Sequence, residues 1–488
     1  MGEYFVRNRF FFLGAVMLLL VLFGAGVFQL YMQNIPRFTP HRPAIPRDIP
    51  RGSDVAVIGG TTAALVAALV AAEHGAQVHL FPQGQELGSD TSFLVNEGLA
   101  TWGAPLQQAW SAGHSADAGD LENSGGEATG GNEAEAREEK VKPTRESFYR
   151  ALQMRGEGMN DPQLLQPFVE QAADLPVWME SLGITFDRLP RPEYNPFWLQ
   201  TSTPQAGQLL REKLLQMLAQ RAVFIQEEAI DWIELAEESG QVQALALRND
   251  QGEAERFYAQ AIILADGGFS GDLRSWNEFL PEHHLVQLRS EQRGRGLQMA
   301  SFLQADVVQF GFLSRRVVLG SPDQGQQELL DRNTWEGLFL VNHQGQALDL
   351  SLSHEAEAFS FIINASPAGV FLAAPSDSVP ARLDFFTSFD SWDRAVDSGW
   401  LDQAPGLQLE PPYLLAPVKA GVDYTLGGLS VTHRGEVRRR GGVVPGLYAA
   451  GEIAGGLHGE ALLEGMPLSE TLFLGRAAGE AAATFARR

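Results

Sequence analysis

The chain has 488 residues, 44% of them hydrophobic, which is enough to bury a large core and to form two or more domains. Its 60 acidic residues outnumber its 36 basic ones, and the formal charge of −24 argues against nucleic acid as a partner, because such binding needs clustered cations. There is no cysteine, which excludes disulfides, thiolate metal sites and cysteine nucleophiles.

An uncharged, apolar run covers Phe10–Phe28. At about 1.5 Å per residue it is long enough to cross most of a ~30 Å hydrocarbon layer, so it predicts one transmembrane helix within an N-terminal anchor, residues 1–33. A cleaved signal peptide is the alternative, because Gly24, Ala25 and Gly26 offer small residues. The lack of cysteine favours a periplasmic or otherwise extracytoplasmic globular part. Residues 34–52 hold a proline every few positions and predict an extended linker.

The segment Asp54–Leu80 predicts a strand, a glycine turn, a long helix and a second strand. This is the pattern of the first βαβ unit of a dinucleotide-binding sheet. In the G-x-G-x-x-G slots stand Gly59, Thr61 and Ala64, and the threonine narrows the approach of a phosphate. Pro82 replaces the acidic residue that would hold a ribose. An ordinary buried βαβ unit that binds nothing remains the alternative.

Residues 112–142 are rich in Gly, Ala, Ser, Glu and Asp and predict a mobile acidic loop, with a docking segment for a basic partner as the alternative. Helical patterns follow over Glu146–Asp187 and Gln205–Ala222. Short strands are then predicted at Phe224–Gln226, Trp232–Leu235, Val242–Arg248, Arg256–Ala259 and Ala261–Leu264. The tail from Thr425 onward shows the same order of strand, glycine turn and helix as the segment that begins at Asp54. The sequence therefore predicts that both segments contribute strands to one sheet and that the residues between them include an inserted domain.

The most specific motifs are short and glycine-rich, and most lie in the tail. They are Gly88–Thr91, Ala265–Phe269, Tyr424–Gly428, Pro445–Glu452, Gly455–Gly459 and Pro467–Gly479. Over residues 53–488 the chain resembles the flavoprotein family of fumarate reductases, succinate dehydrogenase flavoprotein subunits and 3-ketosteroid dehydrogenases. The resemblance implies an α/β fold with a Rossmann-like FAD-binding domain (53–307 and 421–488), an inserted α+β capping domain (308–420) and the preceding transmembrane helix.

The resemblance implies FAD as the cofactor. The bond to FAD would be non-covalent, because Asp90 stands where succinate dehydrogenases carry the linking histidine. Glu452 would accept hydrogen bonds from ribityl hydroxyls, and Ala229 would lie beside the adenine. The implied cofactor-binding residues are Gly59, Gly60, Thr61, Thr62, Ala64, Gly88, Ser89, Thr91, Ala229, Ala265, Gly267, Gly268, Gly451, Glu452, Pro467 and Leu468.

The substrate residues of the family are not retained. Members that reduce fumarate hold the dicarboxylate with arginines and histidines. By the resemblance, Ala347 and Leu462 replace arginines, and Glu355 takes the place of the proton-donating arginine. Asp423 and Tyr424 replace a histidine pair. Each lost charge-assisted contact is worth on the order of 1.5–3 kcal/mol, so the sequence predicts a substrate other than a dicarboxylate.

The polar residues left in the expected cleft are His354, Glu355, Asp423, Tyr424, His458, Glu460 and Glu464. His354, Glu355 and Tyr424 are the catalytic candidates, with Glu355 or Tyr424 as general acid or base beside the flavin. No metal site is predicted, because His283 and His284 lack a third ligand at metal spacing.

The predicted function is a membrane-anchored FAD-dependent oxidoreductase that acts on a neutral or cationic, non-dicarboxylate substrate. It would exchange electrons with a quinone, a cytochrome or another partner in a membrane complex. One alternative is a catalytically silent flavoprotein-like subunit that serves as a structural or binding module. Another is a flavin-dependent desaturase of an apolar substrate.

Overall fold

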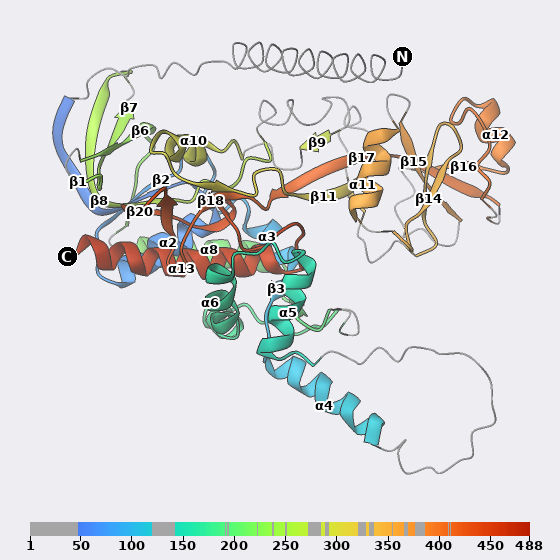
Figure 1. Cartoon of the computed structure of the whole chain (residues 1–488), viewed down its shortest axis with the longest axis horizontal. Helices are drawn as coiled ribbons and strands as arrows, with labels where there is room; N and C mark the ends of the chain where they lie inside the picture. Colours follow the sequence, from blue (N-terminus) through green and yellow to red (C-terminus); the bar gives the residue numbers. More distant parts are fainter. Residues whose placement is uncertain are drawn as a thin grey trace, which may run out of the picture. The chain divides into compact units, whose positions relative to one another are not determined.

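The computed structural model describes most of one compact unit, Pro46–Arg488 (Figure 1). The described residues are 47–119, 142–190, 192, 195–221, 223–236, 239–248, 251–271, 285–287, 292–320, 328–330, 336–353, 355–365, 369–375, 386–407, 409 and 411–488. The predicted anchor Phe10–Phe28 lies outside them. Over the ranges just given, no helix combines the length and apolar character that crossing a lipid bilayer requires.

A mainly parallel sheet carries the glycine turns. Its strands lie in the order β19 (Glu436–Arg439), β20 (Gly442–Ala449), β8 (Ala254–Leu264), β1 (Arg47–Ile58), β2 (Val78–Phe81) and β5 (Val223–Ile225). In addition, β7 (Val242–Arg248) pairs antiparallel with β8, and β6 (Ala229–Leu235) pairs antiparallel with β7. Val55 of β1 lies opposite Val78 on one side and Ala261 on the other. Because β20 pairs with β8, the two ends of the chain complete one sheet, as the sequence predicts.

Several predicted boundaries change in the structure. β1 begins at Arg47, inside the segment 34–52 predicted as an extended linker, and β6 begins at Ala229, three residues before the predicted strand. The segments predicted separately at Arg256–Ala259 and Ala261–Leu264 form the single strand β8. The βαβ unit of the opening is confirmed as β1, α2 (Thr62–Glu73) and β2. This unit can be predicted from the local sequence because β1 ends in four fully buried apolar residues, Val55–Ile58, which the glycine turn follows directly.

The helices α2 and α13 (Met466–Ala486) pack together beside this sheet (Figure 1). α2 is buried from Thr62 to Ala71, because both the sheet and α13 cover it. Small residues permit the close approach of the two helices. A Cβ added to Gly479 would lie 2.5 Å from the carbonyl oxygen of Ala67, and one added to Gly475 would lie 3.0 Å from a methyl of Val66.

Shorter helices follow β2 in the sequence and precede β5. They are α3 (Thr91–Glu97), α4 (Pro105–Gly119), α5 (Arg145–Arg155), α6 (Pro162–Ala172), α7 (Leu175–Ser181) and α8 (Ala206–Ala219), and the short pair β3 (Leu99–Ala100) and β4 (Trp198–Leu199) lies among them. α5 to α7 confirm the helical pattern predicted over Glu146–Asp187. α4 continues to Gly119, so helix enters the segment predicted as an acidic loop. The rest of that segment, 120–141, lies outside the described residues.

A second, mostly antiparallel sheet has its own apolar core. Its order is β12 (Glu328–Leu329), β11 (Leu313–Leu319), β17 (Tyr413–Thr425), β15 (Val370–Pro375), β13 (Phe339–Asn342) and β14 (Ala347–Asp349), and β16 (Thr387–Phe389) and β9 (Leu285–Gln287) also pair with β17. The helix α11 (Glu355–Asn364) packs on β11 and β17, and α12 (Trp392–Asp397) lies near β16 (Figure 1).

Short elements join the two sheets. They are α10 (Arg295–Phe302), the strands β10 (Val307–Val308), β18 (Gly428–Ser430) and β21 (Ala454–Gly455), and the 3₁₀ helix η4 (Gly451–Ile453). β17 is 13 residues long and ends at Thr425, against η4. The end of β17 therefore reaches the glycine turns of the parallel sheet.

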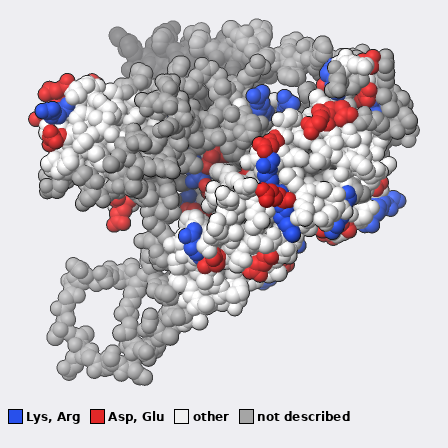
Figure 2. Space-filling view, turned by 180° about the vertical axis from the view of Figure 1, so that it is seen from behind, with Lys and Arg blue, Asp and Glu red and all other residues white. Residues whose placement is uncertain are grey.

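Basic and acidic side chains are interleaved over the described part of the face shown in Figure 2. Among the described residues, basic and acidic side chains also form ion pairs, such as Arg248 with Asp231 at 2.5 Å and Arg256 with Glu234 at 2.7 Å. The excess negative charge of the chain is therefore not gathered into one patch on this face.

Candidate functional site

The first glycine turn is tied to the end of β8. Gly59 has a φ of +124°, and an added Cβ would lie 2.2 Å from the carbonyl oxygen of Ala265, so the turn requires glycine. Thr61 caps α2, because its Oγ1 accepts from the amide of Ala64 at 3.3 Å. The same hydroxyl donates to the carbonyl of Ala265 at 2.6 Å. The threonine in the second glycine slot thus binds its own chain.

A carboxylate lies at the N-terminus of α2, where the sequence predicts a pyrophosphate. Asp90 Oδ1 accepts from the backbone N–H of Thr62 at 2.8 Å and from its hydroxyl at 2.7 Å. The hydroxyls of Thr62 and Thr91 are also within hydrogen-bond distance, at 2.7 Å. Gln85 accepts from the N–H of Gly60 at 2.7 Å. The backbone N–H groups of Gly60 and Thr62 are therefore bound by side chains of the chain itself.

The ribityl end of the predicted groove is closed in a similar way. Glu452 Oε1 accepts from the backbone N–H of Thr425 at 2.8 Å and from its hydroxyl at 3.1 Å. A Cβ on Gly268 would lie only 2.1 Å from the hydroxyl of Thr425 and 2.4 Å from Glu452. A Cβ on Gly451 would lie 2.6 Å from that of Ala63 in α2, so the predicted meeting of the two ends of the chain is confirmed.

Tyr424 is buried against α13. Its hydroxyl donates to Glu470 Oε2 at 2.7 Å, and His458 Nε2 lies 2.8 Å from the same oxygen. The rings of Tyr424 and His458 meet edge to face with centroids 6.0 Å apart. The side chains of His458 and Glu470 are each 1% exposed. The catalytic candidate Tyr424 is therefore part of a buried three-residue cluster.

These contacts decide whether FAD fits the described arrangement. A groove wide enough for a dinucleotide would leave its walls accessible to water. Instead Thr61, Thr62, Asp90, Glu452 and Tyr424 are at most 8% exposed. In this conformation the carboxylate of Asp90 holds the N–H of Thr62 that a pyrophosphate would bind, so FAD does not fit at this end of the groove unless Asp90 moves.

The remaining predicted cofactor residues are divided between surface and core. Ser89 is exposed, and Ala229 is exposed at the start of β6. The residues on either side of Ala229, Glu228 and Ile230, are bonded to the side chain of Gln83, so Ala229 lies beside the loop that follows β2. Leu468 is buried in the first turn of α13.

The catalytic candidates are not brought together by any contact between described side chains. His354 lies outside the described residues. Glu355 begins α11, and the position of its side chain is not described. Ala347, at the first of the lost arginine positions, lies exposed on β14. Within the described residues, no group of three or more His, Asp and Glu side chains is placed to hold a metal ion.

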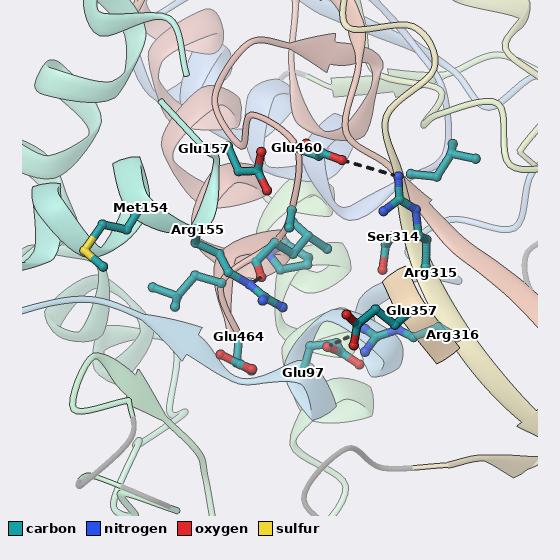
Figure 3. Close-up of a pocket in the computed structure, with 15 residues that line it drawn as sticks. Glu97, Met154, Arg155, Glu157, Ser314, Arg315, Arg316, Glu357, Glu460 and Glu464 are labelled. Carbon is teal, nitrogen blue, oxygen red and sulfur yellow. Dashed lines mark hydrogen bonds and ion pairs between the residues drawn. The ribbon is translucent and has the colours of Figure 1, made fainter. Parts of the chain in front are cut away.

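A cavity of about 300 Å³ lies between β11, the C-terminal end of α5 and the loop before α13 (Figure 3). Pro467 and Leu462 form part of its wall. Its ionisable lining consists of Glu97, Glu157, Glu357, Glu460, Glu464, Arg155, Arg315 and Arg316. Glutamates therefore outnumber arginines in the lining by five to three.

Arg316 is held between two carboxylates. Its Nε lies 2.7 Å from Asp423, and its terminal nitrogen lies 3.1 Å from Glu97. Arg315 lies 3.6 Å from Glu460 (Figure 3). Arg315 and Arg316 are not among the residues predicted from the sequence, because the family resemblance points to other arginine positions. Two adjacent arginines within the otherwise apolar strand β11 are the sequence signal that could have identified them.

The second glycine turn buries Asp266. Oδ2 of Asp266 accepts from the N–H of Gly296 at 2.8 Å, whereas Oδ1 has no hydrogen-bond partner. Burial raises the pKa of Asp266 to about 6, and the N–H of Gly296 opposes this shift. Asp266, Gln85, Arg293 and Arg295 line a cavity of about 280 Å³.

Known proteins share both the sequence and the fold. An NADH:fumarate oxidoreductase of Klebsiella pneumoniae (strain 342) is 24% identical, and the match covers 90% of this chain but only 48% of that relative. A fumarate reductase (cytochrome) of Shewanella frigidimarina is 22% identical over 89% of this chain and 78% of the relative.

Solved structures agree with these relatives in fold. The open conformation of a flavocytochrome c3 fumarate reductase aligns with a TM-score of 0.73 and 19% identity, over 90% of this chain and 79% of that one. The 3-ketosteroid-Δ4-(5α)-dehydrogenase of Rhodococcus jostii RHA1 aligns with a TM-score of 0.66 and 18% identity, over 90% of this chain and all of that one. The chain thus has the mixed α/β fold of a fumarate reductase flavoprotein.

The family model named FAD binding domain matches residues 54–468. The match, with these relatives, confirms the resemblance predicted from the motifs and indicates FAD as the cofactor. The chain belongs to the FAD binding domain family of fumarate reductase-like flavoproteins.

Proposed function

We propose that this chain is an FAD-dependent oxidoreductase that acts on a neutral or cationic substrate and not on a dicarboxylate. The observation that carries the proposal is the charge of the 300 Å³ cavity, whose lining holds five glutamates and three arginines. Arg316 is already paired with Asp423 and Glu97, so its guanidinium is not available as a bidentate clamp for a substrate carboxylate.

Electrostatics decides against a dianion in this cavity. At an effective dielectric constant of about 20, two like charges about 6 Å apart repel by roughly 3 kcal/mol. Because five glutamates and three arginines line the cavity, a dicarboxylate would meet more repulsive than attractive charges, whereas an amine or another cation would meet more attractive ones. The lining residues would therefore select and orient a substrate by its positive charge or by its lack of negative charge.

The wider setting is also part of the proposal. A Rossmann-like FAD-binding domain with an inserted capping domain would be held at the membrane by Phe10–Phe28, on the extracytoplasmic side. A quinone or a cytochrome would exchange electrons with it. Support for such partners comes from proteins named fumarate reductase (cytochrome) and quinol-fumarate reductase among the similar ones.

A catalytically silent structural or binding module is the second candidate. The closed groove favours it, because Asp90, Glu452 and Tyr424 are buried and bonded to their own chain along its length. In this case the fold would be retained as a surface for assembly, without redox chemistry.

One experiment separates the two candidates. The full-length chain, purified in detergent, is incubated with excess FAD and reduced with dithionite, and its visible spectrum is followed on addition of fumarate, of an unsaturated amine or of a soluble quinone. The oxidoreductase proposal predicts uptake of FAD and its reoxidation by the amine or the quinone, but not by fumarate. Reoxidation by fumarate at the rate of the other acceptors would overturn the substrate assignment, and failure to take up FAD would favour the silent module.

A further inference from the structure

The first turn of α2 is suited to a negative charge. The backbone N–H groups at a helix N-terminus are unpaired within the helix and carry a partial positive charge. α2 has no acidic residue in its own first turn. In dinucleotide-binding folds the pyrophosphate supplies the negative charge at this position.

Here the charge comes from Asp90, in the loop that follows β2. Its Oδ1 accepts from both the N–H and the hydroxyl of Thr62, 28 residues away in sequence. Asp90 is also the N-cap residue of α3, where aspartate is among the preferred residues, yet it makes no side-chain capping bond to that helix. The carboxylate is therefore committed to α2 and not to the helix that it precedes.

The same loop closes over the glycine turn. The N–H of Gly88 donates to the carbonyl of Gly60 at 2.6 Å. Gln85 links the two glycine turns, because it accepts from Gly60 and donates to the carbonyl of Asp266 at 2.8 Å. Asp90 itself is 8% exposed. A phosphate cannot reach the N–H of Thr62 while this loop and its carboxylate stay in place.

We infer that Asp90 is an internal anion that occupies the phosphate end of the groove, and that FAD binds this chain only by displacing it. Two anions at one helix terminus repel each other, so occupation by Asp90 and by pyrophosphate are mutually exclusive. The net free energy of FAD binding is then the free energy of its own contacts less that of the contacts between Asp90 and Thr62, which FAD breaks. The inference takes FAD as the ligand from the proposed function, but it concerns affinity and not the reaction.

The test compares FAD affinity among four full-length proteins by quenching of flavin fluorescence. They are the wild type, Asp90→Asn, Asp90→Ser and the control Asp54→Asn. Asp90→Asn keeps an oxygen acceptor for Thr62 but removes the charge. Asp54→Asn makes the same charge change within β1, away from the glycine turn, where Asp54 accepts from the N–H of Gln77 at 2.8 Å. Circular dichroism shows whether each variant is folded.

We expect both Asp90 variants to lower the dissociation constant for FAD at least tenfold, and Asp54→Asn to change it less than twofold. Equal and tight binding by all four proteins would overturn the inference and leave the proposed function standing. Absence of binding by all four would overturn both. If one Asp90 variant does not fold, the other carries the same comparison.

Discussion

Asp266 lies in the second glycine turn, Ala265–Phe269, and the fold buries it. One of its oxygens has an N–H donor and the other has none, so burial disfavours the charged form. The pKa of Asp266, about 6, therefore lies well above its ordinary value of 3.8. This residue makes the stability of the protein dependent on pH.

Between about pH 4 and pH 6 the folded protein binds more protons at Asp266 than the unfolded chain does. The contribution of Asp266 to stability is therefore fully present below about pH 4 and is lost as the pH rises through about 6. A shift of about two pKa units corresponds to on the order of 3 kcal/mol. We predict that Asp266→Asn removes this part of the fall in unfolding free energy between pH 4 and pH 7, measured by urea denaturation.

The matched control for that measurement is Asp393→Asn, at an exposed position of α12. It should leave the pH dependence as it is in the wild type. A profile for Asp266→Asn that falls as steeply as that of the wild type would contradict the assignment.

Tyr424 shows a second effect of burial on a single residue. Its hydroxyl is bonded to Glu470 within the core, so we predict that Tyr424→Phe lowers the free energy of unfolding by about 1–3 kcal/mol, because a buried acceptor loses its donor. The control is Tyr149→Phe, since Tyr149 is half-buried and its hydroxyl accepts from Gln153 at 3.3 Å. Urea denaturation measures the free energy of unfolding of both variants. An equal decrease in Tyr424→Phe and Tyr149→Phe would contradict a larger contribution of the buried bond to Glu470.

Individual site residues were only partly predictable. The family resemblance predicts that Glu452 accepts hydrogen bonds from ribityl hydroxyls, and in the structure it accepts hydrogen bonds from Thr425. The role of Asp90 was missed, because its partner Thr62 lies 28 residues away and no local pattern links them. Contacts between side chains of distant segments depend on how loops fold over one another, which periodicity does not report.

At the scale of elements, the packing of α13 on α2 depends on small residues. Gly479→Ala would gain up to about 1 kcal/mol of helix propensity. The added methyl, however, would lie 2.5 Å from the carbonyl oxygen of Ala67, and overpacking of this kind costs about 1–3 kcal/mol. We therefore predict a lower melting temperature for Gly479→Ala. Gly311→Ala is the control, because no atom lies within 4 Å of its added Cβ, and a Gly479→Ala protein as stable as the wild type would contradict the packing argument.

Elements with strong local signals were predicted well. The strand, glycine turn and helix of β1 and α2 follow from a buried apolar run and its glycines, and α5 to α7 follow from helical periodicity. The continuity of β8 was missed, because its partly buried first half, before Ala261, alternates differently from its fully buried second half. α4 extends further than predicted, because low apolar content predicts a loop but does not prevent the backbone from forming a helix.

At the scale of the whole molecule, the sequence predicts that both ends of the chain contribute to one sheet, because both ends show the same order of strand, glycine turn and helix. The pairing of β20 with β8 confirms this prediction. What the sequence did not reveal is that the groove between them is filled by the chain itself. The motifs of a family record which backbone positions surround a cofactor. They do not record whether neighbouring side chains leave room for it, since one carboxylate at Asp90 is enough to close the phosphate end.

The measurement that tests this account most directly is the amount of FAD retained per chain by the full-length protein after extensive dialysis, determined from the visible spectrum of the released flavin. Because FAD must displace Asp90, we predict far less than one FAD per chain in the wild type and a higher ratio in Asp90→Asn. One FAD per chain that survives dialysis in the wild type would contradict the closed groove.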